Sequence, residues 1–351
     1  MDKVRLGVLS HAHGHVGAYC GVLRDFPDAE VVVSWDDNPE RGRAAAASYG
    51  HEFRDSAAAV VEDPGVDAVM IGIETNRHAD MVELAAAAGK HILLQKPMAT
   101  TLADCDRIIR AVNDSGVKFS MAFQMRQDPS NQAIKRLLDE GVVGNVSVVR
   151  RRHCIGVLLN PQFVNSPSRW HFDPEANIGM FFDDASHPAD WFYWLLGQPV
   201  SVMAEIDRIV TPIDTDDTGI AVYRFGRGEM GFLFNASTTV AGVNTTEIYG
   251  DEGTIIQDYD DGPSTAAPRP ANACALRYMR QGDKAWTEIP MDIPAAHGAR
   301  IGNVPRPFVD YVLGRTDATI TAEEGRVSVE MVLAAYRSAQ EGRRISLPLE
   351  D

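Results

Sequence analysis

The stretch 177–197, NIGMFFDDASHPADWFYWLLG, places three ionisable side chains at near-helical spacing beside an aromatic run. Asp183 and His187 are four residues apart, so on a helix they share one face, and Asp190 follows three residues later. A carboxylate beside an imidazole can do general acid–base chemistry near neutral pH. The same spacing is common on ordinary helices, where the histidine has a structural partner and the aspartate lies at the surface. Both interpretations are open on this stretch alone.

Composition narrows the classes of protein. A chain of 351 residues suits about two domains, and an apolar fraction of 45% is sufficient for real cores. The net charge of −16, with no long basic run, argues against nucleic acid and anionic membranes as partners. Four scattered cysteines without a CxxC pair fit a reducing compartment. The start lacks the apolar core of a signal peptide and no segment is apolar over about eighteen residues, so we expect a cytoplasmic protein that is not embedded in a membrane.

The first third alternates short apolar runs with helical patterns. The expected strands are 4–9, 29–35, 66–73, 91–94 and 118–123, and the expected helices are 15–26, 38–49, 78–88 and 102–115. This alternation predicts βαβ units and a parallel sheet of the Rossmann type. In such sheets the ligand lies beyond the carboxyl ends of the strands.

A dinucleotide pyrophosphate would lie in the turn after the first strand. That turn usually reads GxGxxG, but here none of the three glycines is in place in the register Ser10-His11-Ala12-His13-Gly14-His15. A register shifted by two residues supplies two of the three. The start of the following helix still offers amide groups and a positive dipole end to a phosphate. We therefore expect the turn formed by Ser10, His11, Ala12, His13, Gly14 and His15 to bind the cofactor.

Asp36 ends the second strand, where an acidic side chain can accept hydrogen bonds from ribose hydroxyls and would repel a 2′-phosphate. This favours NAD and leaves NADP open. The alternative is a loop carboxylate in a helix-start sequence, WDDNPERG.

Histidines 11, 13 and 15 also invite a metal hypothesis, because imidazoles two apart on a strand point the same way. The following strands bring no matching ligand set, so we expect no metal. The alternatives are that the imidazoles line the cofactor or substrate cleft, or cap the helix.

The remainder of the chain differs in pattern. A helix at 130–140 precedes a long strand at 142–153, a loop at 156–177 containing three prolines, and alternating strands at 200–209, 218–225, 229–239, 243–249 and 253–258. These strands predict an open, mostly antiparallel sheet. We expect 263–272 to be an exposed excursion. An uncovered apolar face on such a sheet needs a partner, which predicts a homodimer or homotetramer.

The run 66–97, ending in HILLQKP, resembles the Gfo/Idh/MocA oxidoreductase family, whose usual motif is a strand followed by Glu-Lys-Pro. Lys96 and Pro97 match that motif, Gln95 replaces the glutamate, and His78 falls where the family usually has a histidine. Asp183 and His187 fall on the family's Asp-x-x-x-His motif. Motifs in the same order extend across nearly the whole chain, including 123–126, 215–217, 247–253 and the closing 320–348. Glu74-Thr75 stands where Pro-Asn is common, and Gly179 remains from a glycine-rich run.

The resemblance implies an α/β chain with a Rossmann NAD(P)-binding domain at 1–123 and an α+β domain at 124–351 for substrate and oligomerisation. It implies that Lys96 and His187 work at the carbon that exchanges a hydride with nicotinamide, with Asp183 orienting the substrate or His187. Residues expected beside the cofactor, in addition to the turn and Asp36, are Glu74, Thr75, His78, Gln95 and Lys96. Residues expected around the substrate, in addition to the catalytic three, are Gln124, Arg126, Arg152, His153, Trp170 and His171.

Three functions remain in view. The first is NAD(P)-dependent oxidation or reduction of a sugar, cyclitol or related polyol. The second is a lyase, hydrolase or epimerase of the same fold that works through a keto-sugar without net redox change, which the missing glycines and the histidine cluster motivate. The third is a non-catalytic sugar sensor, against which Lys96, Asp183 and His187 argue.

Overall fold

The computed structural model describes residues 2–259, 268–317 and 320–350, and it divides into two compact units. The first unit comprises the chain up to Gln124 together with Glu175–Asn177 and Ile301–Val329. The second comprises Met125–Pro174, Ile178–Arg300 and the chain from Glu330 onward. The assignment of 1–123 to cofactor and 124–351 to substrate stays a prediction.

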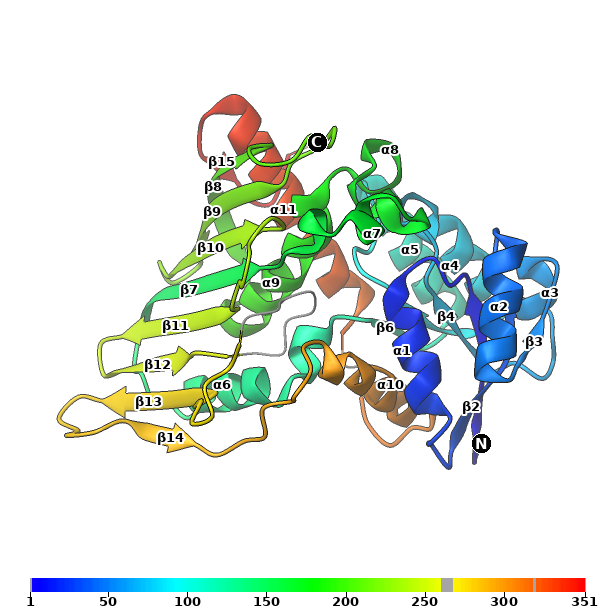
Figure 1. Cartoon of the computed structure of the whole chain (residues 1–351), viewed down its shortest axis with the longest axis horizontal. Helices are drawn as coiled ribbons and strands as arrows, with labels where there is room; N and C mark the ends of the chain where they lie inside the picture. The colour runs from blue at the N-terminus through cyan, green and yellow to red at the C-terminus, as the bar shows by residue number, and fades with distance from the viewer. Residues whose placement is uncertain (1, 260–267, 318–319, 351) are drawn as a thin grey trace. The chain divides into compact units, whose positions relative to one another are not determined.

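The first unit is built on a six-stranded sheet in the order β3-β2-β1-β4-β5-β6, with every neighbouring pair parallel (Figure 1). The order turns back on itself at β1, which is the doubly wound arrangement with the ligand crevice at the switch point. This confirms the predicted parallel Rossmann-type sheet. The strands are β1 (Val4–Leu9), β2 (Ala29–Trp35), β3 (Glu52–Phe53), β4 (Ala68–Ile71), β5 (His91–Leu94) and β6 (Phe119–Met121).

Helices of the first unit begin and end at residue types that commonly cap helices. In α2, for example, Asn38 caps the first N–H groups, Pro39 opens the helix, and Gly50 ends it at φ 80°. The helices are α1 (Gly14–Leu23), α2 (Pro39–Tyr49), α3 (Ala57–Val61), η1 (Thr75–Arg77), α4 (His78–Ala87), α5 (Leu102–Ser115) and α10 (Pro305–Val312). Helices α3 and α10 and strand β3 were not predicted from the sequence. Phe308 and Val309 of α10 pack into the same apolar core as Val4, Leu6 and Val8 of β1.

The second unit holds a nine-stranded sheet in the order β14-β13-β12-β11-β7-β10-β9-β8-β15 (Figure 1). All neighbours are antiparallel except β7 and β10, which confirms the predicted mostly antiparallel sheet. The strands are β7 (Val146–Cys154), β8 (Pro199–Asp207), β9 (Thr218–Phe225), β10 (Met230–Ala236), β11 (Thr245–Gly250), β12 (Gly253–Gln257), β13 (Leu276–Arg280), β14 (Thr287–Ile289) and β15 (Ile345–Ser346). Strands β13 and β14 were not predicted. Residues 263–267 of the predicted excursion lie outside the described residues.

One long helix, α9 (Met180–Leu196), packs across β7, β8, β9 and β10 and carries the Asp183–His187 motif. The other helices of this part of the chain are η2 (Gln124–Gln127), α6 (Pro129–Asp139), η3 (Val157–Leu159), α7 (Pro161–Val164), η4 (Pro167–Phe172), α8 (Pro174–Asn177), η5 (Ala299–Asn303) and α11 (Ala322–Glu341). The predicted loop at 156–177 is therefore wrong, because it consists largely of short helices. Among the described residues, no helix combines the length and apolarity that crossing a membrane would require.

Candidate functional site

The turn after β1 keeps a glycine-like backbone without the glycines. Ser10 has φ 72°, in the left-handed region that glycine normally occupies. The Ala12 N–H donates to Ser10 Oγ at 3.2 Å, and the His13 N–H donates to the Gly72 carbonyl at 2.9 Å. The N–H of Gly14, the first residue of α1, has no partner among the described residues, and a Cβ on Gly14 would meet no atom within 4 Å. The helix start thus retains one open amide for a phosphate.

Asp36 is buried, and the chain itself supplies donors to both of its oxygens. Oδ1 accepts from Arg41 Nη2 at 2.7 Å and from the Asn38 N–H at 2.8 Å, while Oδ2 accepts from the His11 N–H at 2.7 Å. Burial raises the pKa of Asp36, but the bonds from Arg41, His11 and Asn38 outweigh it and hold the pKa below its usual value. Arg41 is the more exposed member of this ion pair, and the expected contact of Asp36 with the ribose hydroxyls stays a prediction.

The three histidines of the turn have separate roles. His13 Nδ1 accepts from the His15 N–H at 3.2 Å and so caps α1, one of the alternatives considered above. The His11 ring lies nearly parallel to those of His51 and Tyr49, with centroids 5.8 and 6.5 Å away. Burial, followed by repulsion from His51, lowers the pKa of His11 to about 4, so His11 adds no positive charge near neutral pH. Over 2–259, 268–317 and 320–350, no group of three or more His, Cys, Asp or Glu side chains could hold a metal ion.

His78 is a structural histidine in this chain. Its Nε2 lies 3.0 Å from the Ile73 carbonyl, and its Nδ1 lies 3.0 Å from the Pro97 carbonyl and 3.2 Å from that of Met98. Burial lowers the pKa of His78 to about 4. Both ring nitrogens are engaged with the backbone after β4 and β5, so the side chain fixes these two strand ends. The expected place of His78 beside the cofactor stays a prediction.

The other residues expected beside the cofactor differ in burial and in the partners of their polar atoms. Gln95 is buried, and its Nε2 donates to Tyr19 Oη at 2.9 Å. This hydrogen bond links the end of β5 to helix α1. Glu74 pairs with Arg77 at 3.4 Å. Thr75 is fully buried, and its Oγ1 has no hydrogen-bond partner among the described residues. Lys96, 3% exposed, follows β5 directly.

The start of α9 is held by two side chains that approach closely. The Phe181 N–H donates to Asp216 Oδ1 at 2.5 Å, and the Phe182 N–H donates to Tyr336 Oη at 3.0 Å. Tyr336 Oη in turn donates to Asp216 Oδ2 at 2.6 Å. A Cβ on Gly179, which precedes the helix, would lie 2.1 Å from Asp216 Oδ2 and 2.8 Å from Tyr336 Oη. A glycine at 179 is therefore what allows these groups to satisfy the first turn of the catalytic-motif helix.

We expect Gly179→Ala to destabilise the protein by about 1–3 kcal/mol, because the added methyl group overpacks the Asp216–Tyr336 cap. Urea denaturation followed by circular dichroism measures this directly. Gly226→Ala is the matched control, because a Cβ at Gly226 would meet nothing within 4 Å. A loss for Gly179→Ala within the roughly 0.5 kcal/mol of an ordinary surface substitution would contradict this account of the cap.

Asp183 and His187 lie on α9, and both are almost fully buried. Asp183 Oδ1 lies 3.0 Å from His171 Nδ1. The Trp170 ring stacks on that of His171, with centroids 3.8 Å apart. Of the expected substrate residues, Trp170 and His171 are thus brought to the catalytic motif.

Two further residues, Asp184 of α9 and Arg151 of β7, belong to the same group of side chains, although the motif spacing did not single them out. Asp184 Oδ1 lies 3.5 Å from His153 Nε2, and the His153 and His187 ring centroids are 6.1 Å apart. Arg151, which is fully buried, lies 3.1 Å from His153 Nδ1 through its Nη2. The alternation of β7 could have identified Arg151, since it shares a face with His153.

Arg152 and Arg126 have partners within the chain, and their expected role at the substrate stays a prediction. Because strand residues alternate in direction, Arg152 lies on the opposite face of β7 from His153, and its Nε donates to the Val243 carbonyl at 2.7 Å. The Arg126 guanidinium donates hydrogen bonds of 2.9 and 2.6 Å to the two carboxylate oxygens of Asp190, and both side chains are buried. Gln124 Oε1 is buried without a partner among the described residues and remains a candidate.

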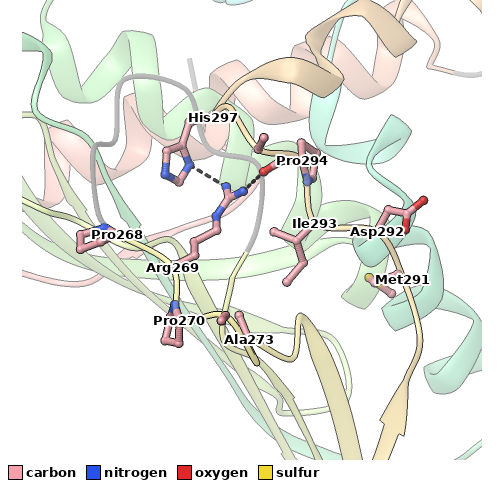
Figure 2. Close-up of a pocket in the computed structure, with 11 residues that line it drawn as sticks. Pro268, Arg269, Pro270, Ala273, Met291, Asp292, Ile293, Pro294 and His297 are labelled. Atoms are coloured by element: carbon pink, nitrogen blue, oxygen red, sulfur yellow. Dashed lines mark hydrogen bonds between the residues drawn. The ribbon is translucent and has the colours of Figure 1, made fainter.

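A cavity of about 630 Å³ lies elsewhere in the second unit (Figure 2). Figure 2 shows the Arg269 side chain reaching His297 and Pro294 across it, and Arg269 Nη2 lies 2.8 Å from His297 Nδ1. None of the residues expected to bind substrate lines it. We therefore do not assign the substrate to this cavity.

The residues around the turn fit a dinucleotide in part. The open Gly14 amide could meet a phosphate, and the buried Thr75 hydroxyl and the His11 ring nitrogens lack partners within the described chain. Buried polar groups without partners are uncommon in folded proteins, and a bound ligand is one way in which they are satisfied.

Two family models match the chain. The model described as an oxidoreductase family with an NAD-binding Rossmann fold, GFO_IDH_MocA, matches residues 13–123. The model described as the GFO/IDH/MocA C-terminal domain matches residues 131–256.

Relatives of known name match over most of the chain. A levoglucosan dehydrogenase of Pseudarthrobacter phenanthrenivorans is 30% identical over 263 residues, which is 67% of this chain and 66% of the relative. A myo-inositol 2-dehydrogenase of Thermotoga maritima is 24% identical over 353 residues, 98% of each protein. Among solved structures, a levoglucosan dehydrogenase in complex with NADH and levoglucosan has a TM-score of 0.84 at 22% identity, covering 99% of this chain and 100% of that one. This solved structure therefore shares the fold of the chain.

Proposed function

Because the chain belongs to the Gfo/Idh/MocA family of oxidoreductases, with an NAD-binding Rossmann fold, we propose that it transfers a hydride between a nicotinamide cofactor and a secondary alcohol or ketone of a sugar, cyclitol or related polyol. One observation carries this proposal within the family match. The Asp-x-x-x-His motif lies in a buried turn of α9, where Asp183 is engaged by His171 and the His187 ring lies near that of His153.

The turn after β1, with the open Gly14 amide, would hold the dinucleotide, and the nicotinamide would supply the hydride acceptor for the carbinol carbon of the substrate. His187 accepts the hydroxyl proton as the alcohol becomes a ketone. Lys96 donates a hydrogen bond to the same oxygen and stabilises the negative charge that develops on it. Asp183 holds His171 and positions a second hydroxyl of the substrate. The stacked Trp170–His171 pair supplies an aromatic surface of the kind that sugars bind.

The first experiment is an assay of the purified chain against sugars and cyclitols, including myo-inositol and levoglucosan, with NAD⁺ and NADP⁺ separately. We expect formation of reduced nicotinamide with at least one substrate. Testing both cofactors matters because Arg41 covers Asp36. Tight NADH binding without turnover of any polyol or keto-sugar would argue against the proposal. A product formed without net change in NADH would favour the lyase or epimerase alternative, which the dehydrogenase and reductase names of the relatives do not favour.

We also propose that a second copy of the chain covers the outer face of the nine-stranded sheet. Val200 and Met203 of β8, Ile220 of β9 and Tyr249 of β11 are 40–47% exposed, a large apolar content for a surface open to water. Light scattering should show a homodimer or homotetramer at micromolar concentration. Ile220→Lys should shift the protein toward smaller species, whereas Val240→Lys, at an 81% exposed residue outside the strands, should not. A monomeric wild-type protein would contradict this proposal.

A further inference from the structure

The turn of α9 that carries His187 has two carboxylates on the preceding turn, and each is paired with its own histidine. Asp183 Oδ1 lies 3.0 Å from His171 Nδ1, and Asp184 Oδ1 lies 3.5 Å from His153 Nε2. The family motif uses Asp183. Asp184 lies three residues before His187, so the two side chains are neighbours on the helix surface. All of these side chains are 7% exposed or less.

Arg151 determines which nitrogen of His153 carries the proton. A guanidinium has donors and no acceptor, so the 3.1 Å contact of Arg151 Nη2 with His153 Nδ1 requires Nδ1 to accept. Neutral His153 therefore carries its hydrogen on Nε2, which lies 3.5 Å from Asp184 Oδ1, close enough for an electrostatic pair but without a formed hydrogen bond. The position of Arg151 is itself fixed, because its Nη1 donates to Thr246 Oγ1 and Gln257 Oε1, each at 3.0 Å.

Asp184 is surrounded by donors. Its Oδ2 accepts from Asn235 Nδ2 at 2.8 Å, and the same amide donates to the His153 carbonyl at 3.1 Å. The backbone of Asp184 differs from that of its neighbours. Residue 188 is a proline without an N–H, so it donates no helical hydrogen bond to the Asp184 backbone carbonyl. The Asn235 amide thus fixes the Oδ2 side of the carboxylate, and the His153 ring lies beside Oδ1. The network from Arg151 to Gln257 consists of a guanidinium, the Thr246 hydroxyl and an amide, and its role here is to hold the position of Arg151.

We propose, on the basis of the function proposed above, that Asp184 and His153 form a positioning pair for His187. The pair fixes a negative charge one turn before His187, where it stabilises the imidazolium that forms when the substrate hydroxyl gives up its proton. Asp183 and His171 face the substrate side of the motif, and Asp184 with His153 supports it from the sheet. The other charged or titratable groups on α9 and the elements packed against this part of it are Arg151, Cys154, Arg126, Asp190 and Tyr336.

A first test does not depend on turnover. In nitrogen-15 histidine spectra of the full chain, His153 should be the Nε2–H tautomer near neutral pH. In Asp184→Asn the midpoint of the His187 titration should move to lower pH by about one unit, because a neighbouring negative charge favours the protonated ring. Asp207→Asn, which removes an exposed carboxylate at the end of β8, should leave that midpoint unchanged. An Nδ1–H tautomer of His153, or an unmoved His187 midpoint in Asp184→Asn, would overturn the proposal.

A second test uses kinetics once a substrate is known. Asp184→Asn and His153→Leu should each lower kcat about 10-fold with KM changed less than about threefold, since the pair acts on the protonated state formed during reaction. His153→Gln should recover part of kcat because its amide can donate to Asp184. If His153→Leu fails to fold, His153→Gln and Asp184→Asn carry the test. A wild-type protein that oxidises no polyol refutes the proposed function, whereas an active wild type with equally active variants refutes the positioning pair alone.

Discussion

Replacing His187 with asparagine is expected to lower kcat by about 10²–10⁴-fold, the usual contribution of a positioned general base. His187 is 2% exposed on α9, and asparagine preserves polarity and approximate size without a group that accepts the hydroxyl proton at neutral pH. Steady-state oxidation of the best substrate, with NADH binding followed by fluorescence, separates chemistry from cofactor affinity. The dissociation constant of NADH should remain within a few-fold of the wild-type value.

The control for His187→Asn is His51→Asn, a partly buried histidine of the first unit that bonds to Ser34 Oγ at 3.0 Å and belongs to no proposed catalytic group. It should retain most of the wild-type kcat. If His187→Asn turned over polyol at the wild-type rate, another residue would have to take the proton, and the assignment of the base would be abandoned.

Replacing Lys96 with methionine is expected to lower kcat by about 10²–10³-fold, the usual loss when one donor to a developing oxyanion is removed. Methionine fills a similar volume, and Lys96 is only 3% exposed, so packing after β5 should change little. The measurement is kcat together with KM, because a donor that acts in the transition state affects kcat and kcat/KM alike. Lys135→Met on α6 is the matched control, since Lys135 forms an ion pair with Asp139 on the same helix and belongs to no proposed site. A Lys96→Met protein with unchanged kcat and raised KM would place Lys96 in substrate binding alone.

Much of the fold followed from periodicity. Strands β1, β2, β5 and β9 and helix α5 begin and end where apolar pattern and caps predicted, because each is long enough to bury one continuous face. Elements as short as β3 and α3 carry too few residues to show a period. Helices α7, η4 and α8 were visible in principle, because Pro161, Pro167 and Pro174 each open a helix and the first two follow a capping Asn160 or Ser166. The prolines were interpreted as loop signals instead.

The site was predictable in residue type more than in contact. Asp183, His187 and Lys96 follow motifs, but the partners of Asp36 and Arg126 come from side chains whose direction no spacing reveals, Arg41 and Asp190. Strand geometry alone separates Arg152 from His153, because neighbouring residues of one strand face opposite sides of a sheet. The tautomer of His153 depends on Arg151, a contact within one strand face that needs coordinates to establish.

The measurement that tests the central claim most directly is transfer of a deuterium label. A polyol substrate carrying deuterium at the carbinol carbon is incubated with the protein and oxidised nicotinamide, and the reduced cofactor is isolated for mass spectrometry. The account predicts one deuterium in each reduced nicotinamide and an equal amount of ketone product. Label released to water, or product formed while the cofactor stays oxidised and unlabelled, would contradict hydride transfer as the function of this chain.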